Sequence, residues 1–110
     1  MELQCEEIGQ IQVVHVIGKI DSTSAEAFRQ GIEKIIANGN RQLLFDFSRV
    51  PYINSAGLRV VLVTVKILKE PGDRCAFCGL SAEVLGVFEV AGFTRILQFY
   101  PSVIDATSSW

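Results

Sequence analysis

The stretch from Leu43 to Lys69, LLFDFSRVPYINSAGLRVVLVTVKILK, joins two different patterns and decides the class of fold. Leu43–Phe47 is a short apolar run with one acid near its end, which is typical of a strand buried on both faces of a parallel sheet. Ser48–Asn54 is predicted to be a loop, because Pro51 interrupts regular secondary structure there. Ala56–Lys69 is rich in valine, which favours a strand, but about 14 residues is long for a strand and ordinary for a helix. We therefore predict a helix there, whose apolar stripe consists of Leu58, Val61, Leu62, Val65 and Leu68.

The residues before this stretch predict two strands and a helix. Leu3–Ile8 is a weak strand candidate, and a glycine turn leads from it into the β-branched strand Ile11–Ile17. Thr23 and Glu26 have the spacing of a capping box, in which each side chain satisfies a free amide at a helix start. Asn38–Gly39 supplies a left-handed stop. Between these signals, apolar residues recur at helical spacing: Ala25, Phe28, Ile32, Ile35 and Ile36.

The residues after the stretch continue the alternation of strands and helices. Arg74–Cys78 is a short strand, and Ser81 can cap a helix that stops at Gly92. Arg95–Tyr100 is a last strand, and a short terminal helix follows it. The order β-β-α-β-α-β-α-β-α predicts an α/β fold in a single domain over residues 1–110. Its sheet should be mixed, mostly parallel and four- to five-stranded, with about four helices.

Composition excludes several classes of protein. The 110 residues are 49% hydrophobic, which is enough apolar material for a core and argues against intrinsic disorder. Ten basic against twelve acidic residues give a net charge of -2, which argues against nucleic-acid binding. Arg59 and Lys66 interrupt the longest apolar run, so we expect no membrane span. The acidic N-terminus lacks the pattern of a secretion signal, and three cysteines cannot form a closed disulfide set, so we expect a cytoplasmic protein.

Cysteine and histidine offer no strong metal or catalytic motif. Cys75 and Cys78 have CxxC spacing, but zinc would need further ligands, and the chain offers Cys5 and His15, both in predicted early strands. We expect Cys75 and Cys78 to act as small core hydrophobes. A triad of Ser55, His15 and Asp46 is conceivable, but the sequence around Ser55 is not the G-x-S-x-G elbow of hydrolases. We therefore expect no metal, no cofactor and no enzymatic activity.

Ser55 stands where the predicted loop enters the long helix, as an N-cap or first-turn residue. Its simplest role there is to cap the helix. The position also suits a modified hydroxyl, because a phosphate at a helix N-terminus meets free amides and the positive end of the helix dipole. The same helix carries Val60, Val63 and Ile67 on a second apolar face, beside Arg59. Because so small a chain has few elements to cover that face, we expect it to contact a partner.

Several motifs of the chain resemble those of the STAS domain family. Gly18–Asp21 is similar to the family's G-x-[IL]-D after the second strand, and Asp46–Ser48 is similar to its D-[LF]-S at the end of the third strand. Asn54–Leu58 is similar to the [DNS]-S-[SAT]-G-L motif, including Gly57, that opens the second helix. Weaker signatures match Cys78–Ser81 and Phe88–Phe93. Within the family, the chain resembles the stand-alone bacterial anti-sigma factor antagonists.

This resemblance implies a STAS-like fold and a switch without chemistry of its own. Such proteins bind an anti-sigma factor that is also a serine/threonine kinase, which frees a sigma factor. The kinase then phosphorylates the serine that matches Ser55, and a PP2C-type phosphatase resets the switch. Asp21 and Asp46 match family acids near the acceptor. Many phosphorylated members have Asp where this chain has Asn54.

Two other functions remain open at the level of sequence. STAS domains also serve as interaction or scaffold modules in which the serine is not phosphorylated. Alternatively, Ser55 and the helix N-terminus could hold the phosphate of a nucleotide or lipid without covalent change. The sequence does not indicate an oligomeric state.

Overall fold

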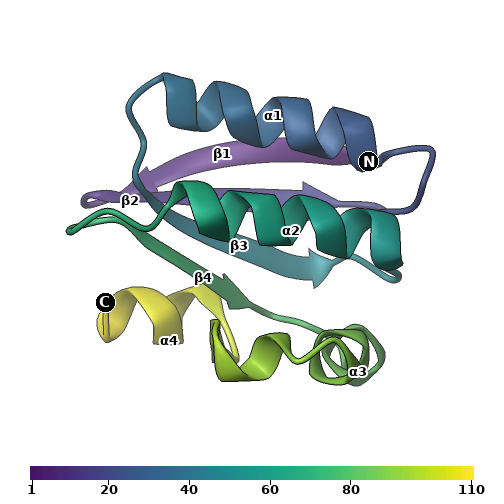
Figure 1. The fold of residues 1–110 in the computed structure, drawn as a ribbon. Helices are drawn as coiled ribbons and strands as arrows, with labels where there is room; N and C mark the ends of the chain where they lie inside the picture. The colour runs from purple at the N-terminus through teal and green to yellow at the C-terminus, as the bar shows by residue number, and fades with distance from the viewer.

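The strands form one sheet in the order β1-β2-β3-β4-β5, and a computed structural model describes all residues from 1 to 110 (Figure 1). The strands are β1 (Glu2–Ile8), β2 (Ile11–Ile17), β3 (Gln42–Arg49), β4 (Arg74–Cys78) and β5 (Gln98–Tyr100). The helices are α1 (Ala25–Ala37), α2 (Ser55–Ile67), α3 (Ala82–Val90) and α4 (Val103–Ser108), with a 3-10 turn, η1, at Phe93–Arg95. β1 and β2 are antiparallel, and every other neighbouring pair is parallel. The predicted α/β class and mixed sheet are confirmed.

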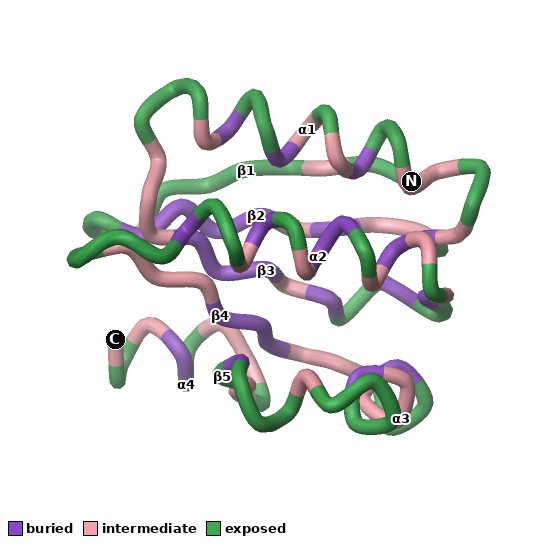
Figure 2. The backbone as a smooth tube through the Cα atoms, viewed as in Figure 1, coloured by how far each residue is buried: buried purple, intermediate pink, exposed green.

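The two faces of the sheet carry separate apolar clusters. Helices α1, α2 and α3 pack on one face, around five phenylalanines that are each less than 2% exposed: Phe28, Phe45, Phe47, Phe77 and Phe88. Helix α4 packs on the opposite face, where Ala106 contacts a smaller cluster that includes Leu44 and Cys78. Figure 2 shows the result: the central strands are mostly buried, whereas the edge strand β1 is mostly exposed.

Two local predictions are wrong. The capping box does not form, because Ser24 is the N-cap of α1 and the Thr23 hydroxyl donates instead to Asp21 Oδ1, at 2.6 Å. Glu26 instead forms an ion pair with Arg29, on the next turn of the helix. The last strand is also shorter than predicted, because residues 93–95 form η1 and only Gln98–Tyr100 pair with β4. The predicted stop at Asn38–Gly39 and the Ser81 cap are confirmed.

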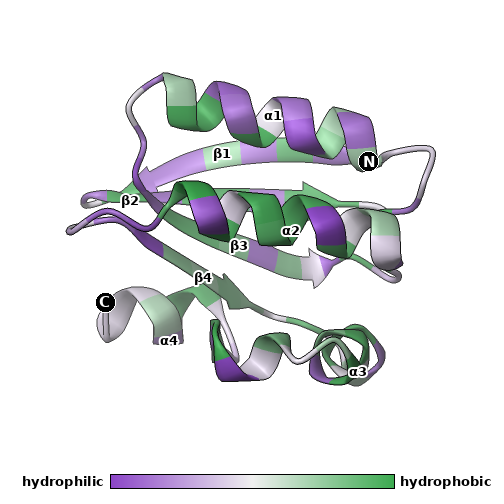
Figure 3. Ribbon diagram, viewed as in Figure 1, coloured by the Kyte–Doolittle hydropathy of each residue, from purple (hydrophilic) through white to green (hydrophobic).

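Helix α2 is hydrophobic over most of its length, as Figure 3 shows. Its most buried residues are Gly57, Val60, Val61, Thr64 and the C-cap Leu68. Of the predicted stripe, Leu58, Leu62 and Val65 are only half-buried. No helix of the chain combines the length and the apolar character needed to cross a bilayer.

Candidate functional site at the start of helix α2

Ser55 is the first residue of α2, and its side chain is exposed. The residue before it, Asn54, caps the helix: Asn54 Oδ1 accepts hydrogen bonds from the amides of Ala56, at 3.0 Å, and Gly57, at 3.4 Å. Asparagine is among the best N-cap residues, so this role could have been predicted from sequence. Because Asn54 satisfies these free amides, the Ser55 hydroxyl is not required for capping.

A short parallel bridge brings the loop after β2 beside the start of α2. Ile20 pairs with Ile53, the Ile20 amide donates to the Tyr52 carbonyl at 2.9 Å, and the Asn54 amide donates to the Ile20 carbonyl at 3.1 Å. Asp21 follows Ile20 directly, so the structure places its loop alongside Asn54. Hydrogen bonds from Thr23 hold the pKa of the Asp21 carboxyl below its ordinary value. A negative charge therefore lies on the loop that contacts Asn54.

Gly57 allows the first turn of α2 to approach this bridge closely. A Cβ at position 57 would lie 2.7 Å from Ile20 Cγ2 and 2.7 Å from Ile53 Cγ1. Ordinary carbon–carbon contacts lie at about 3.5–4.0 Å. Both isoleucines are at most 1% exposed, so they cannot easily move aside. The glycine of the N-S-A-G-L motif is therefore needed for packing at the N-terminal end of the helix.

Gly57→Ala is accordingly expected to destabilise the fold, although alanine is the better helix former. Overpacking costs about 1–3 kcal/mol, and the helix propensity of alanine returns about 1 kcal/mol, so we expect a net loss of up to about 2 kcal/mol. Gly86 in α3 is the matched control, since a Cβ there would meet nothing within 4 Å. Gly86→Ala should stabilise by up to about 1 kcal/mol. Urea unfolding measures both; equal stabilisation by the two variants would contradict the packing role of Gly57.

Asp46 lies on the α4 face of the sheet, in register with His15 of β2 and Cys78 of β4. Its Oδ2 lies 2.7 Å from His15 Nδ1, and its Oδ1 accepts from the Ser48 amide at 3.0 Å. Burial opposes ionisation, but these hydrogen bonds outweigh it and hold the pKa of Asp46 below its ordinary value. Ser55 belongs to the helix on the other face, so the structure does not assemble the conceivable Ser55–His15–Asp46 triad.

His15 bridges two carboxylates, because its Nε2 also lies 2.7 Å from Glu6 Oε1. Carboxylate oxygens only accept hydrogen bonds, so two such contacts require a proton on each ring nitrogen. Burial lowers the pKa of His15, but the bonds to Glu6 and Asp46 outweigh it and leave the pKa above its ordinary value of 6.5. The charged ring therefore ties β1, β2 and β3 together.

This bridge predicts a pH dependence of stability. The His15 pKa is higher in the folded state, so the contribution of the bridge is complete below the unfolded pKa, about 6.5, and is lost as pH rises through the folded pKa. We expect the unfolding free energy of the wild type to fall between about pH 6 and pH 9 by more than that of His15→Gln, which cannot titrate. Urea unfolding at several pH values provides the test. Parallel curves for the two proteins would contradict it.

The two CxxC cysteines point to opposite faces of β4: Cys75 packs against the main core and Cys78 against the α4 cluster. Burial raises the pKa of each thiol to about 12, and Asp46 adds to the effect at Cys78. No three His, Cys, Asp or Glu side chains are grouped so as to hold a metal ion. The expected role of Cys78 as a core residue agrees with its complete burial.

A mostly apolar groove of about 540 Å³ lies between α2 and α3, and Ser55 is one of its lining residues. Val90, at 92% exposed, stands at its rim. Its lining residues are Ser55, Leu58, Glu83, Gly86, Val87, Val90 and Ala91. The sequence analysis missed the α3 side of this groove, because helical spacing on one segment does not reveal which other helix lies beside it.

The proposed second face of α2 is only partly a surface. Val63 and Ile67 are 40% and 37% exposed, and Arg59 is exposed. Val60, by contrast, is 8% exposed and belongs to the main core. The prediction that Val60 shares an exposed face is therefore wrong, because α1 packs beside α2 and covers that side of the helix. Whether Arg59, Val63 and Ile67 contact a partner stays a prediction.

Comparisons with known proteins show which family the sequence matches. A family profile described as the STAS domain matches residues 2–106. BtrV of Bordetella bronchiseptica, named a candidate anti-sigma factor antagonist, is 33% identical over 96 residues, which are 87% of this chain and 83% of that protein.

Solved structures share the fold. An anti-sigma factor antagonist from Mycobacterium paratuberculosis is 24% identical, with a TM-score of 0.89 over 98% of this chain and 92% of that one. The Bacillus cell fate determinant SpoIIAA, in its phosphorylated form, is 21% identical, with a TM-score of 0.73 over 98% of both chains. The profile match over almost the whole chain shows the membership directly: this chain belongs to the STAS domain family.

Proposed function

We propose that the chain is an anti-sigma factor antagonist: it binds an anti-sigma factor with serine/threonine kinase activity, and a sigma factor is released. The observation that carries the proposal is the position of Ser55. The residue is exposed, is not needed as the helix cap because Asn54 has that role, and lines an apolar groove on a STAS fold. The names of the relatives, anti-sigma factor antagonists, support the same assignment.

Phosphorylation of Ser55 switches the protein off in this proposal. The γ-phosphoryl group of ATP is transferred to Ser55 Oγ, the hydroxyl proton passes to a base of the kinase, and ADP leaves. The product carries about -1.5 to -2 charges beside the groove. A partner surface fitted to a neutral hydroxyl must then desolvate a phosphate, which opposes binding. A PP2C-type phosphatase in the same cytoplasm hydrolyses the phosphate ester and restores the binding state.

The partner surface extends from the groove onto the exposed side of α2. Arg59, Val63 and Ile67 lie on this helix beyond Ser55, and Leu58 and Val90 line the groove. Apolar side chains that remain exposed on a small protein mark an interaction site when they are contiguous. Ser55 lines the groove and lies four residues before Arg59 on the same helix, so its modification affects both regions.

A competition experiment tests this function. The purified chain is added to a preformed complex of a kinase-type anti-sigma factor and its sigma factor from the same organism, without ATP. We expect release of the sigma factor in proportion to the chain added, observed by size exclusion. If the complex stays intact and no chain comigrates with any such anti-sigma factor, the scaffold or ligand-binding alternative becomes the better account.

A further inference from the structure

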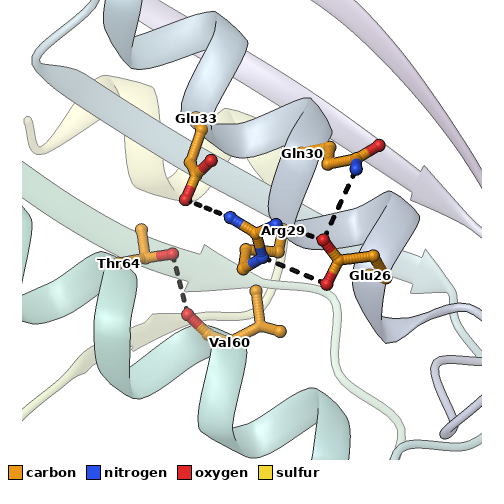
Figure 4. A network of polar contacts seen from close by, with 6 residues as sticks. All are labelled: Glu26, Arg29, Gln30, Glu33, Val60 and Thr64. Carbon is orange, nitrogen blue, oxygen red and sulfur yellow. Dashed lines mark hydrogen bonds and ion pairs between the residues drawn. The ribbon is translucent and has the colours of Figure 1, made fainter.

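Arg59 is a cation without a partner, one helical turn beyond Ser55. Residues four apart on a helix lie on the same side, about 5–6 Å apart at their Cβ atoms. The hollow between α1 and α2 that Arg59 lines contains one acidic side chain, Glu26. Both Glu26 oxygens bind Arg29, which also pairs with Glu33 at 2.5 Å (Figure 4). None of the ion pairs of the chain includes Arg59.

We infer that Arg59 holds the phosphate of phosphorylated Ser55 within the chain, an inference that rests on the proposed function. A phosphoserine offers three strong acceptor oxygens, and a guanidinium donates to such oxygens in pairs. An acidic group four residues before a basic one is the favourable order on a helix. Arg29 cannot compete for this role, because Glu26 and Glu33 occupy its guanidinium.

The ion pair gives phosphorylation a second effect on the partner surface. Before modification, the exposed Arg59 presents a free positive charge next to Val63. After modification, that charge is engaged by the phosphate of the chain itself. A partner that binds Arg59 therefore loses its contact with this guanidinium, and it also faces the negative charge of the new phosphate.

The test measures the ionisation of the phosphate on Ser55. Phosphoserine is installed at position 55 during translation, without a kinase, and the second acid-dissociation constant of the phosphate is determined by ³¹P NMR titration. A nearby cation favours the dianion, so Arg59→Gln should decrease this constant about two- to fourfold, the effect of an i,i+4 pair with a doubly charged partner. Lys66→Gln is the control: Lys66 lies about 16 Å from Ser55 along α2, beyond the Debye length of about 8–10 Å.

The outcomes separate this inference from the proposed function. A decrease in Arg59→Gln with no change in Lys66→Gln supports the ion pair. An unchanged constant in Arg59→Gln, or an equal decrease in both variants, overturns it. Since no kinase takes part, neither result depends on whether an anti-sigma factor phosphorylates Ser55.

Discussion

Val61→Asp is expected to unfold the protein. Val61 is 1% exposed and packs in the main core, on the side of α2 that faces the sheet. An aspartate there would bury a charge with no partner, and such changes reach about 4–5 kcal/mol, a large part of a total stability of about 5–15 kcal/mol. Circular dichroism and urea unfolding should show a largely unfolded chain at neutral pH.

Val63→Asp is the matched control on the same helix. Val63 is 40% exposed, so an aspartate there remains hydrated in the free protein, and we expect a change in stability within about 0.5 kcal/mol. Binding to the anti-sigma factor should be lost, because the charge would be buried only in the complex. If Val63→Asp also unfolds the chain, this face of α2 is internal. If it folds and still binds, Val63 lies outside the interface.

A phosphate on Ser55 is expected to weaken binding to the anti-sigma factor at least about 30-fold, since an unmatched charge in an interface costs about 2–5 kcal/mol. Ser55→Asp should reproduce part of this loss, and Ser55→Ala should bind like the wild type. None of the three changes should unfold the chain, because Ser55 is exposed and Asn54 caps the helix. Isothermal titration with the isolated anti-sigma factor distinguishes these cases. Equal affinities for the wild type and the phosphorylated form would refute the switch.

The order and type of the elements could be predicted because the signals were local. Leu43–Phe47 is apolar on both faces, and the structure places it in a strand at the centre of the sheet, covered by α2 on one side and α4 on the other. The position of Ser55 at the helix start followed from the adjacent loop and the length of the valine-rich run. These features are determined by residues that lie close together in the sequence, so the sequence alone reveals them.

The errors arose where tertiary contacts override local patterns. Val60 follows the spacing of an exposed face, but α1 covers it. Thr23 has the spacing of a capping residue, but the Asp21 carboxylate attracts its hydroxyl more strongly. Asp46 contacts His15 on the α4 face of the sheet, a contact that the family motif does not reveal, and its proximity to Ser55 stays a prediction. The α2–α3 groove was missed because it joins segments far apart in sequence.

The central claim is that Ser55 is the switch residue of an anti-sigma factor antagonist. The most direct measurement incubates the chain with the kinase-type anti-sigma factor and ATP, then maps phosphate by intact-mass and tandem mass spectrometry. The account predicts one phosphate per chain, on Ser55, and none on Ser55→Ala. An unmodified wild type, or a phosphate on another residue, would contradict it.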